Sequence, residues 1–232
     1  MLSDFVSRFL SAFFPERCVF CGKVNYLENS VCVHCAQNAE RIEKPVCPKC
    51  GRGVKNCDCR RRERYFSALC APFYFEGVVR RGVHRFKFRN AVRNAEAFSL
   101  MMAECVRENY PDVSFDCVVG VPMIKADIKA RGYDQCAILS QGVAKHLGLV
   151  YDGTIIEKIY KTKSQHSLKA IMRTGNLTGV FAVTDASRVE GKTLLLCDDV
   201  STSGETLNEC SKMLYLAGAK KIYCAVLALA KK

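Results

Sequence analysis

The stretch LLLCDDVSTSGETL, Leu194 to Leu207, joins an apolar run, two adjacent acids and a hydroxyl-rich turn. Its first four residues, Leu194 to Cys197, are typical of a strand that is buried on both faces of a parallel sheet. Asp198 and Asp199 follow at the carboxyl end of that strand, where open α/β sheets bind their ligands. Apolar residues then recur at helical spacing, which predicts a helix that begins at Gly204 or at the residue after it. The stretch therefore predicts a strand, a turn and a helix with a binding site at their junction.

The turn and the two acids offer different chemistry to a single ligand. The turn presents unpaired backbone amides, side-chain hydroxyls and the positive end of a helix dipole, all of which attract phosphate. The carboxylates would repel that phosphate, but they suit ribose 2′- and 3′-hydroxyls or a Mg²⁺ ion. We therefore predict a site for a phosphorylated sugar. The alternatives are a solvated acidic loop and an ordinary helix N-cap.

This segment resembles the phosphoribosyl-pyrophosphate (PRPP) loop of type I phosphoribosyltransferases, in which a strand, two acids and an apolar pair precede Thr-Thr-Gly-x-Thr. Ser201 stands where that pattern usually has an apolar residue, and Ser203 replaces a threonine. Neither change removes a side chain that could donate a hydrogen bond to the phosphate. The resemblance implies that Asp198 and Asp199 hold the ribose as the catalytic acids and that the loop binds the 5′-phosphate. The implied loop residues are Ser201, Thr202, Ser203, Gly204, Glu205 and Thr206.

The bulk properties of the chain restrict its class. A length of 232 residues suits one α/β domain with a small appendage. The formal net charge of +12 favours anionic partners such as phosphates, nucleic acid or a lipid surface. Asp4 and Arg8 interrupt the first apolar stretch, which argues against a signal peptide, and no apolar run approaches the length of a membrane span. We expect a cytoplasmic protein and keep open a peripheral place at the inner face of the membrane.

Eight of the 15 cysteines fall in the patterns CVFC, CVHC, CPKC and CDC near the amino terminus. Closely spaced cysteines let two thiolates reach one tetrahedral ion from a tight turn, so the patterns predict two structural zinc sites. Metal binding would supply folding energy to a segment too short for its own core. The simplest pairing gives each ion four consecutive cysteines; the alternatives are a crossed pairing, a vestigial second site, an Fe–S cluster and redox dithiols. The predicted ligands are Cys18, Cys21, Cys32 and Cys35 for one ion, and Cys47, Cys50, Cys57 and Cys59 for the other.

Composition divides the chain into three parts. The pattern of residues 1–17 predicts an amphipathic helix. We expect its apolar face to pack on the zinc module or the main domain; the alternative is that it binds a membrane or a partner. Residues 18–64 form the cysteine-rich module, which ends in an arginine run, and residues 65–232 alternate strands with helices, as in a doubly wound parallel sheet. The seven remaining cysteines are predicted to be small core residues. The expected strands cover 67–75, 116–121, 154–159, 179–183, 194–197 and 221–229, and the expected helices before the sugar-phosphate stretch cover 78–88, 95–108 and 135–147.

A second basic stretch, VVGVPMIKADIKARGYDQ, runs from Val118 to Gln135. A strand that ends in Gly-Val-Pro predicts a turn and a basic loop at the same edge of the sheet, where Lys125 and Arg131 would meet a pyrophosphate. A third stretch, residues 162–181, is polar, basic and interrupted by glycine, which indicates a loop that closes over a ligand. Ordinary solvated loops are the alternative for both stretches.

Taken in order, the zinc module, the proline-containing loop, RGYDQ at Arg131 to Gln135, the polar stretch and the PRPP loop resemble the ComF family of competence proteins. RGYDQ matches that family's RG-[FY]-[ND]-Q, while Gly120 stands where many members have the first proline of Pro-Val-Pro. The later match consists of Thr162, Gln165, Leu168, Arg173, Asn176 and Phe181. The resemblance covers nearly the whole chain and implies a type I phosphoribosyltransferase-like α/β domain that binds PRPP, and a part in single-stranded DNA uptake during natural transformation.

Three hypotheses for function follow. The first is a ComF-like protein that binds PRPP with Mg²⁺ and takes part in DNA uptake, with phosphoribosyl transfer left open as an activity. Its partners would be PRPP, single-stranded DNA, and the uptake machinery or a membrane surface. Basic residues interleaved with Phe86 and Phe88 suit single-strand binding by charge and stacking. These candidates are Arg80, Arg81, Arg85, Lys87 and Arg89. The alternatives are a nucleotide-salvage phosphoribosyltransferase unrelated to DNA, and a zinc-dependent interaction protein with a decayed ligand site.

Overall fold

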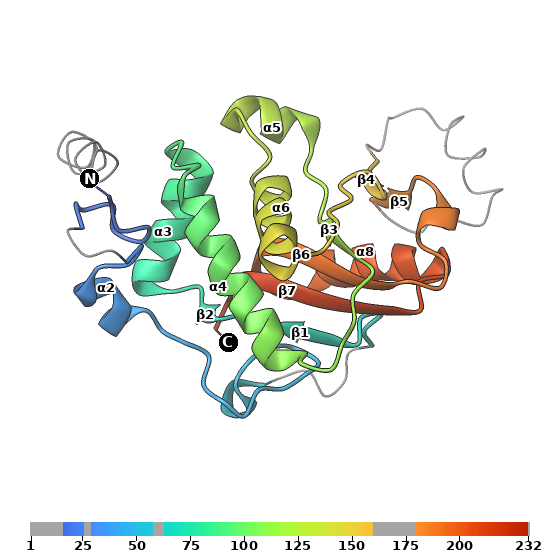
Figure 1. Ribbon diagram of the computed structural model, residues 1–232, viewed down its shortest axis with the longest axis horizontal. Coiled ribbons are helices and arrows are strands. Elements are labelled where there is room, and N and C mark those ends of the chain that lie inside the picture. Colours follow the sequence, from blue (N-terminus) through green and yellow to red (C-terminus); the bar gives the residue numbers. More distant parts are fainter. Residues whose placement is uncertain (1–15, 26–28, 58–62, 160–179, 232) are drawn as a thin grey trace, which may run out of the picture.

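The computed structural model describes residues 16–25, 29–57, 63–159 and 180–231 (Figure 1). Residues 1–15 of the expected amino-terminal helix, most of the polar stretch from 162 to 181, and residues 58–62 lie outside this part of the chain. The helices are α2 (Val33–Asn38), η1 (Val54–Asn56), α3 (Gly77–Phe88), α4 (Asn94–Asn109), α5 (Lys125–Arg131), α6 (Gln135–Leu147), η2 (Ala186–Arg188) and α8 (Glu205–Leu216). The strands are β1 (Ala68–Cys70), β2 (Phe73–Tyr74), β3 (Cys117–Gly120), β4 (Ile156–Lys158), β5 (Phe181–Val183), β6 (Thr193–Ser201) and β7 (Lys221–Leu229).

A parallel sheet forms the centre of the molecule. Strands β6 and β7 lie in its middle, with β3 beside β6 and with β1 and β2 both beside β7. Pro72 falls between β1 and β2 and cannot donate a ladder hydrogen bond, which explains why the strand predicted over 67–75 is interrupted there. Beyond β3, Tyr151 adds one parallel bridge to Val118.

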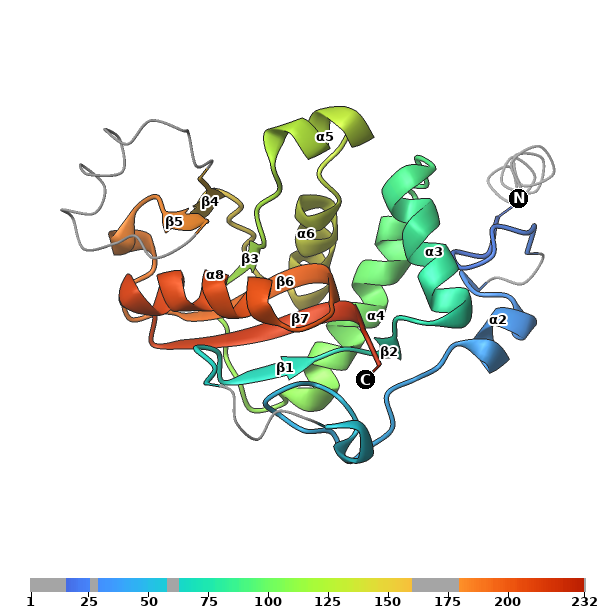
Figure 2. The ribbon, with the colours of Figure 1, turned by 180° about the vertical axis from the view of Figure 1, so that it is seen from behind.

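Helices cover both faces of the sheet. Side chains of β6 alternate, so that Leu195 and Cys197 pack in one core with α3, α4 and α6, while Leu194 and Leu196 pack in a second core with α8. Figures 1 and 2 show α4 and α6 on one side of the sheet and α8 on the other. Burial on both faces is the physical reason for the continuous apolar run in this strand. The predicted doubly wound sheet is confirmed.

Two local predictions are wrong. Strands β4 and β5 occur where they were expected, but they form an antiparallel pair apart from the main sheet. The alternation of strands and helices suggested a place in the parallel sheet, but the residues of a short strand do not fix the direction in which it pairs. Residues 125–131 form helix α5 instead of a basic loop, because KADIKAR is rich in helix-forming residues. Gly132 ends this helix with a left-handed φ of 83°.

The cysteine-rich module shares the core of the main domain. Phe20 is buried against the main domain, with its ring 5.6 Å from that of Phe73 and 5.9 Å from that of Phe98. Gly82 of α3 permits this approach, because a Cβ there would lie 2.7 Å from Cδ1 of Phe20. The seven cysteines outside the patterned pairs are all buried, as predicted. No helix of the described part is both long and apolar enough to cross a bilayer.

Candidate functional site

Strand β6 continues past its predicted end and carries both acids. The sequence predicts an end at Cys197, but β6 reaches Ser201 because β7 pairs with it along this length. Strand β3 pairs with β6 only as far as Gly120, opposite Cys197. Beyond this point Asp198 and Asp199 lie where the strand order changes direction, which is the usual place for a ligand at the carboxyl edge of an open sheet.

Asp199 is held by two side chains from different helices. Its carboxylate is buried, with 4% of the residue exposed. Lys87 of α3 donates from Nζ to Oδ1 at 2.7 Å, and Gln135 of α6 donates from Nε2 to Oδ2 at 3.2 Å. Lys87 was predicted among the nucleic-acid residues, and the structure places it in the acid site instead. The ion pair and the amide hydrogen bond fix the carboxylate before any ligand arrives.

Asp198 has a different environment from its neighbour. Its Oδ1 accepts a hydrogen bond from the Asp199 backbone amide at 2.8 Å. Burial, together with the charge of Asp199, raises the pKa of Asp198 to about 7. Near neutral pH this carboxyl therefore exists in both protonation states, and a cation or a hydroxyl donor would favour the charged one. The pair thus combines one locked carboxylate with one that responds to a ligand.

The predicted phosphate loop lies between the acids and helix α8. Gly204 has a left-handed φ of 81°, and the helix begins at Glu205, as predicted. Ser203 Oγ accepts from the Glu205 amide at 3.3 Å, while Thr202 and Thr206 are exposed. The loop therefore brings hydroxyls and the first turn of α8 together at the edge that carries the acids.

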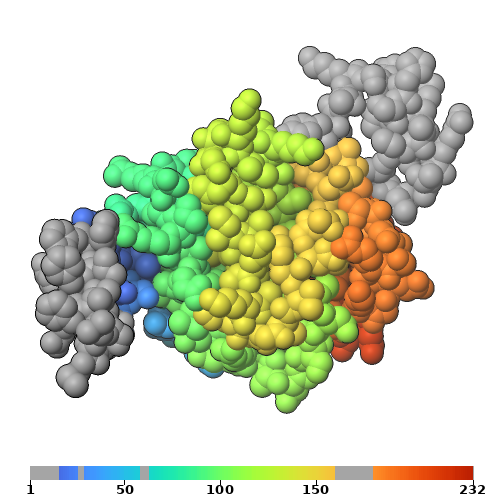
Figure 3. All heavy atoms as spheres, turned by 45° about the horizontal axis from the view of Figure 1, so that its top comes forward, coloured from blue at the N-terminus to red at the C-terminus, as the bar shows by residue number. Residues whose placement is uncertain are grey.

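The two predicted pyrophosphate residues lie at opposite ends of α5. Lys125 lines a cleft of about 470 Å³ with residues that follow β3, with Tyr151 and with β4. Arg131 stacks on the ring of Phe88, with its Cζ 5.2 Å from the ring centroid. Figure 3 shows α5 beside α3 on this face. Of the two residues, only Lys125 lies next to the turn that follows β3.

The first four predicted zinc ligands come together in space. The thiol sulfurs of Cys18, Cys21, Cys32 and Cys35 lie within 4.8 Å of one another. Cys21 and Cys32 have their sulfurs 3.8 Å apart, too long for a disulfide and close to the separation of about 3.8 Å that 2.3 Å bonds to a tetrahedral zinc require. Burial raises the pKa of the Cys18 thiol, but backbone amides that donate to its sulfur outweigh burial and lower the pKa to about 7. These four residues fit a structural zinc ion.

The second set is also gathered, as far as the described residues reach. The thiols of Cys47, Cys50 and Cys57 lie within 4.8 Å of one another, and Cys59 falls outside the described part. The Gly51 amide donates to the Cys47 carbonyl at 2.8 Å, and this bond closes the tight turn that a zinc knuckle needs. The chemistry of three clustered thiols fits a second structural metal.

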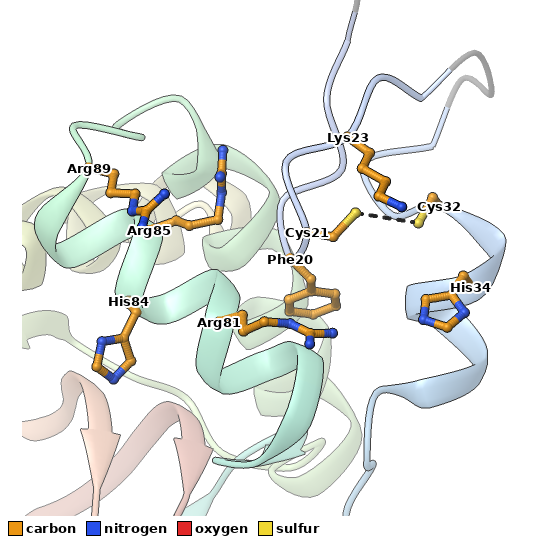
Figure 4. Close-up of a pocket in the computed structure, with 9 residues that line it drawn as sticks. All are labelled: Phe20, Cys21, Lys23, Cys32, His34, Arg81, His84, Arg85 and Arg89. Atoms are coloured by element: carbon orange, nitrogen blue, oxygen red, sulfur yellow. Dashed lines mark hydrogen bonds between the residues drawn. The ribbon is translucent and has the colours of Figure 1, made fainter.

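A basic cleft of about 600 Å³ separates the first cysteine cluster from α3 (Figure 4). Cys21, Cys32 and His34 line one wall, and the α3 side chains line the other, with Phe20 at the base. The cationic residues that line the cleft are Lys23, Arg81, Arg85 and Arg89. Arg80 lies on the ring of Phe75, 6.0 Å from its centroid, and is not among the residues that line the cleft. Three of the five predicted nucleic-acid residues are thus brought together.

Sequence reasoning missed several residues of the site. Gln135 belongs to RGYDQ, so its place in a motif could have drawn attention to it. Arg52 and Arg64, which contact the phosphate loop, had no sequence signal beyond their charge. Their partners lie 150 and 140 residues away along the chain, at Thr202 and Gly204.

Comparison with known proteins agrees with the resemblance that the sequence shows. A double zinc ribbon model matches residues 9–71, and a phosphoribosyl transferase model matches residues 134–232. Competence protein F of Haemophilus influenzae is 26% identical over 220 residues, which span 90% of this chain and 95% of that protein. The chain is therefore similar to ComF-family proteins along nearly its whole length.

Further ComF-family relatives show the same extent of similarity. DNA utilization protein YhgH of Escherichia coli K12 is 26% identical over 83% of this chain and 87% of its own length. Competence protein ComFC of Bacillus subtilis is 25% identical over 82% of this chain and 80% of its own length. Among solved structures, a glutamine PRPP amidotransferase from B. subtilis is 19% identical over 61% of this chain and 30% of that one, with a TM-score of 0.43, too low to support an inference. The family models and the observed sheet confirm a type I phosphoribosyltransferase-like fold with an amino-terminal zinc ribbon.

Proposed function

We propose that this ComF-like protein binds PRPP with Mg²⁺ at the carboxyl edge of its sheet and takes part in the uptake of single-stranded DNA. The observation that carries PRPP binding is the junction of β6 and α8, where two acids and a helix amino terminus meet within nine residues, Asp198 to Thr206. The acids would accept hydrogen bonds from ribose hydroxyls, and the loop would bind the 5′-phosphate. The names of the relatives, competence protein and DNA utilization protein, support the DNA role.

The geometry supports a division of labour between the acids. Asp199 is already bonded through both oxygens, so its orientation costs nothing when the sugar binds. Asp198 has a raised pKa, so contact with hydroxyl donors, or with a bound Mg²⁺ ion, would favour its charged form. Lys125, in the cleft beside β3, would offset charge on the pyrophosphate. When bound, Mg²⁺ would neutralise the pyrophosphate further.

Calorimetry with PRPP and Mg²⁺ tests this proposal on the wild type and on Asp198→Ala. The matched control is Asp112→Ala, which removes an exposed acid between α4 and β3. We expect Asp198→Ala to bind at least about tenfold more weakly, since it loses hydrogen bonds to a charged group, and the control to bind as the wild type does. Equal affinity in all three proteins, or no binding by the wild type, would contradict PRPP binding. A screen for pyrophosphate release from PRPP with nucleobases, amines and water then tests for turnover.

A second proposed activity, single-strand binding, rests on the basic cleft and the rings beside it. His84 lies between Phe75 and Phe88, with ring centroids 6.2 Å and 5.7 Å away, and Phe88 is 63% exposed. His84 and Phe88 lie on the same helix as Arg81 and Arg85 of the cleft, and Phe75 lies just before that helix. Charges that attract a phosphate backbone and rings that stack on bases give binding that is sensitive to salt and tolerant of sequence.

Fluorescence anisotropy with a labelled oligothymidine tests the single-strand site across a salt series. The double variant Arg81→Gln and Arg89→Gln is expected to bind more weakly and to reduce the salt slope by about 0.7 for each phosphate contact that is lost. The double variant Lys220→Gln and Lys221→Gln, which removes two exposed cations at the start of β7, serves as the charge-matched control. Phe88→Ala is expected to weaken binding without changing the salt slope. No binding by the wild type at low salt would end this proposal.

A further inference from the structure

We infer that Arg52, in the second cysteine cluster, is a positioning residue for the phosphate loop, and that metal occupancy of this cluster controls how well the loop captures a sugar 5′-phosphate. This inference rests on the proposed binding of PRPP and concerns the regulation of that site. It starts from the side of the loop that faces away from the acids.

Three consecutive carbonyls of the phosphate loop are held by arginines from the amino-terminal part of the chain. Arg52 donates from Nη2 to the Thr202 carbonyl at 2.7 Å. Arg64 donates to the Ser203 carbonyl at 3.0 Å and to the Gly204 carbonyl at 3.2 Å. In a trans peptide the N–H points away from the carbonyl of the same unit, so these bonds turn the following amides away from the arginines. A phosphate is attracted by amides and repelled by carbonyls, so the arginines hold the loop in its anion-binding orientation.

Arg52 is itself held in place by the turn of the second cluster. The residue is 4% exposed, and its Nε donates to the Ala230 carbonyl at 2.9 Å. Its own carbonyl accepts from the Cys47 amide at 2.8 Å, which ties the arginine to the first residue of the knuckle. Gly51 has a φ of +70°, and a Cβ there would lie 2.7 Å from the Leu69 carbonyl oxygen, so the turn lies directly against β1. Hydrogen bonds thus fix both the backbone carbonyl and the guanidinium of Arg52.

The thiol cluster completes this connection. Cys47 begins the turn that holds Arg52, and it lies with Cys50 and Cys57 in the group that fits a metal. A bound metal would keep this turn closed, and its loss would free the turn, the guanidinium and then the loop. Coupling of this kind is reciprocal, so a ligand on the loop must also strengthen metal retention in the second cluster.

Binding measurements with ribose 5-phosphate test the role of Arg52, since this ligand carries the phosphate that the loop would hold. Arg52→Gln is expected to bind ribose 5-phosphate at least about tenfold more weakly than the wild type, because loss of the guanidinium releases the Thr202 carbonyl. Hydrogen exchange of a peptide that covers residues 201–206 is expected to become faster in the same variant. Arg17→Gln is the matched control, because Arg17 bonds a knuckle carbonyl, that of Gly22 at 3.1 Å, in the first cluster.

The reciprocal effect supplies a readout that does not depend on activity. A colorimetric chelator is expected to remove zinc from the second cluster of the wild type more slowly when ribose 5-phosphate is present, and this protection is expected to vanish in Arg52→Gln. If Arg52→Gln does not fold, the wild-type release rates alone decide, and equal rates with and without the ligand would overturn the inference. If the wild type binds neither ribose 5-phosphate nor PRPP, the proposed function fails. If the wild type binds and Arg52→Gln binds equally well, the proposed function stands and the role of Arg52 is refuted.

Discussion

Replacing Lys87 by methionine should destabilise the protein through the buried Asp199 carboxylate. The Lys87 ammonium lies 2.7 Å from Oδ1 of Asp199, and the two side chains are 21% and 5% exposed. Methionine keeps most of the aliphatic stem, so the change removes mainly the charge. It leaves Asp199 in the site with the Gln135 amide as its side-chain donor.

The expected loss follows from the burial of the pair. Removing one partner of a fully buried ion pair costs about 3–5 kcal/mol, because the remaining charge is left uncompensated. The ammonium is partly solvated and Gln135 still donates to Asp199, so we expect a smaller loss of about 2 kcal/mol in the free energy of unfolding. For a chain of this size, that loss corresponds to a decrease of about 4–8 °C in melting temperature.

A double-mutant cycle measures the interaction directly. Urea unfolding followed by circular dichroism would compare the wild type, Lys87→Met, Asp199→Asn and the double variant, and we expect a coupling energy of at least about 1 kcal/mol. The matched control is the exposed pair between Lys145 and Glu96, where an N–O distance of 3.3 Å and side-chain exposures of 70% and 63% predict a coupling of at most about 0.5 kcal/mol. An equally small coupling for Lys87 and Asp199, with weakened DNA binding in Lys87→Met, would return Lys87 to the nucleic-acid surface and refute the reasoning.

Three further predictions concern stability. Burial and the charge of Asp199 raise the pKa of Asp198 to about 7, so the stability contributed by the neutral carboxyl is present near pH 4 and is lost as the pH rises toward 7. Asp198→Asn should therefore gain melting temperature over the wild type at pH 8 relative to pH 4, and a gain independent of pH would count against the raised pKa. Gly82→Ala would place a Cβ 2.7 Å from Cδ1 of Phe20 and should cost about 1–3 kcal/mol in thermal unfolding, so an unchanged melting temperature would argue against this packing. Cys35→Ser, at a buried thiol of the first cluster, should remove one zinc per chain by elemental analysis and lower the melting temperature, whereas full zinc retention would exclude that thiol as a ligand.

Local patterns in the chain were enough to predict most of the elements of the fold. The apolar run of β6, the turn at Gly204 and the start of α8 are adjacent in sequence, so periodicity and residue type place them correctly. The close spacing of the cysteines likewise brings Cys18 and Cys21 to one turn. Strand pairing was harder to predict from the sequence. Strands β4 and β5 pair through backbone hydrogen bonds, and the residues of neither strand determine the direction of that pairing.

The candidate site likewise has features that the sequence predicts and contacts that depend on tertiary packing. By itself the sequence determined that two acids precede a phosphate-type loop at the end of a buried strand, since strand, acids and loop are consecutive. Only the tertiary structure decided that Lys87 and Gln135 hold Asp199, across separations of 112 and 64 residues, and that Arg52 holds the loop from 150 residues away. These contacts arise because α3, α6 and the second cysteine cluster pack around one edge of the sheet. Packing of this kind depends on the shape and burial of whole elements, which no short stretch of sequence contains.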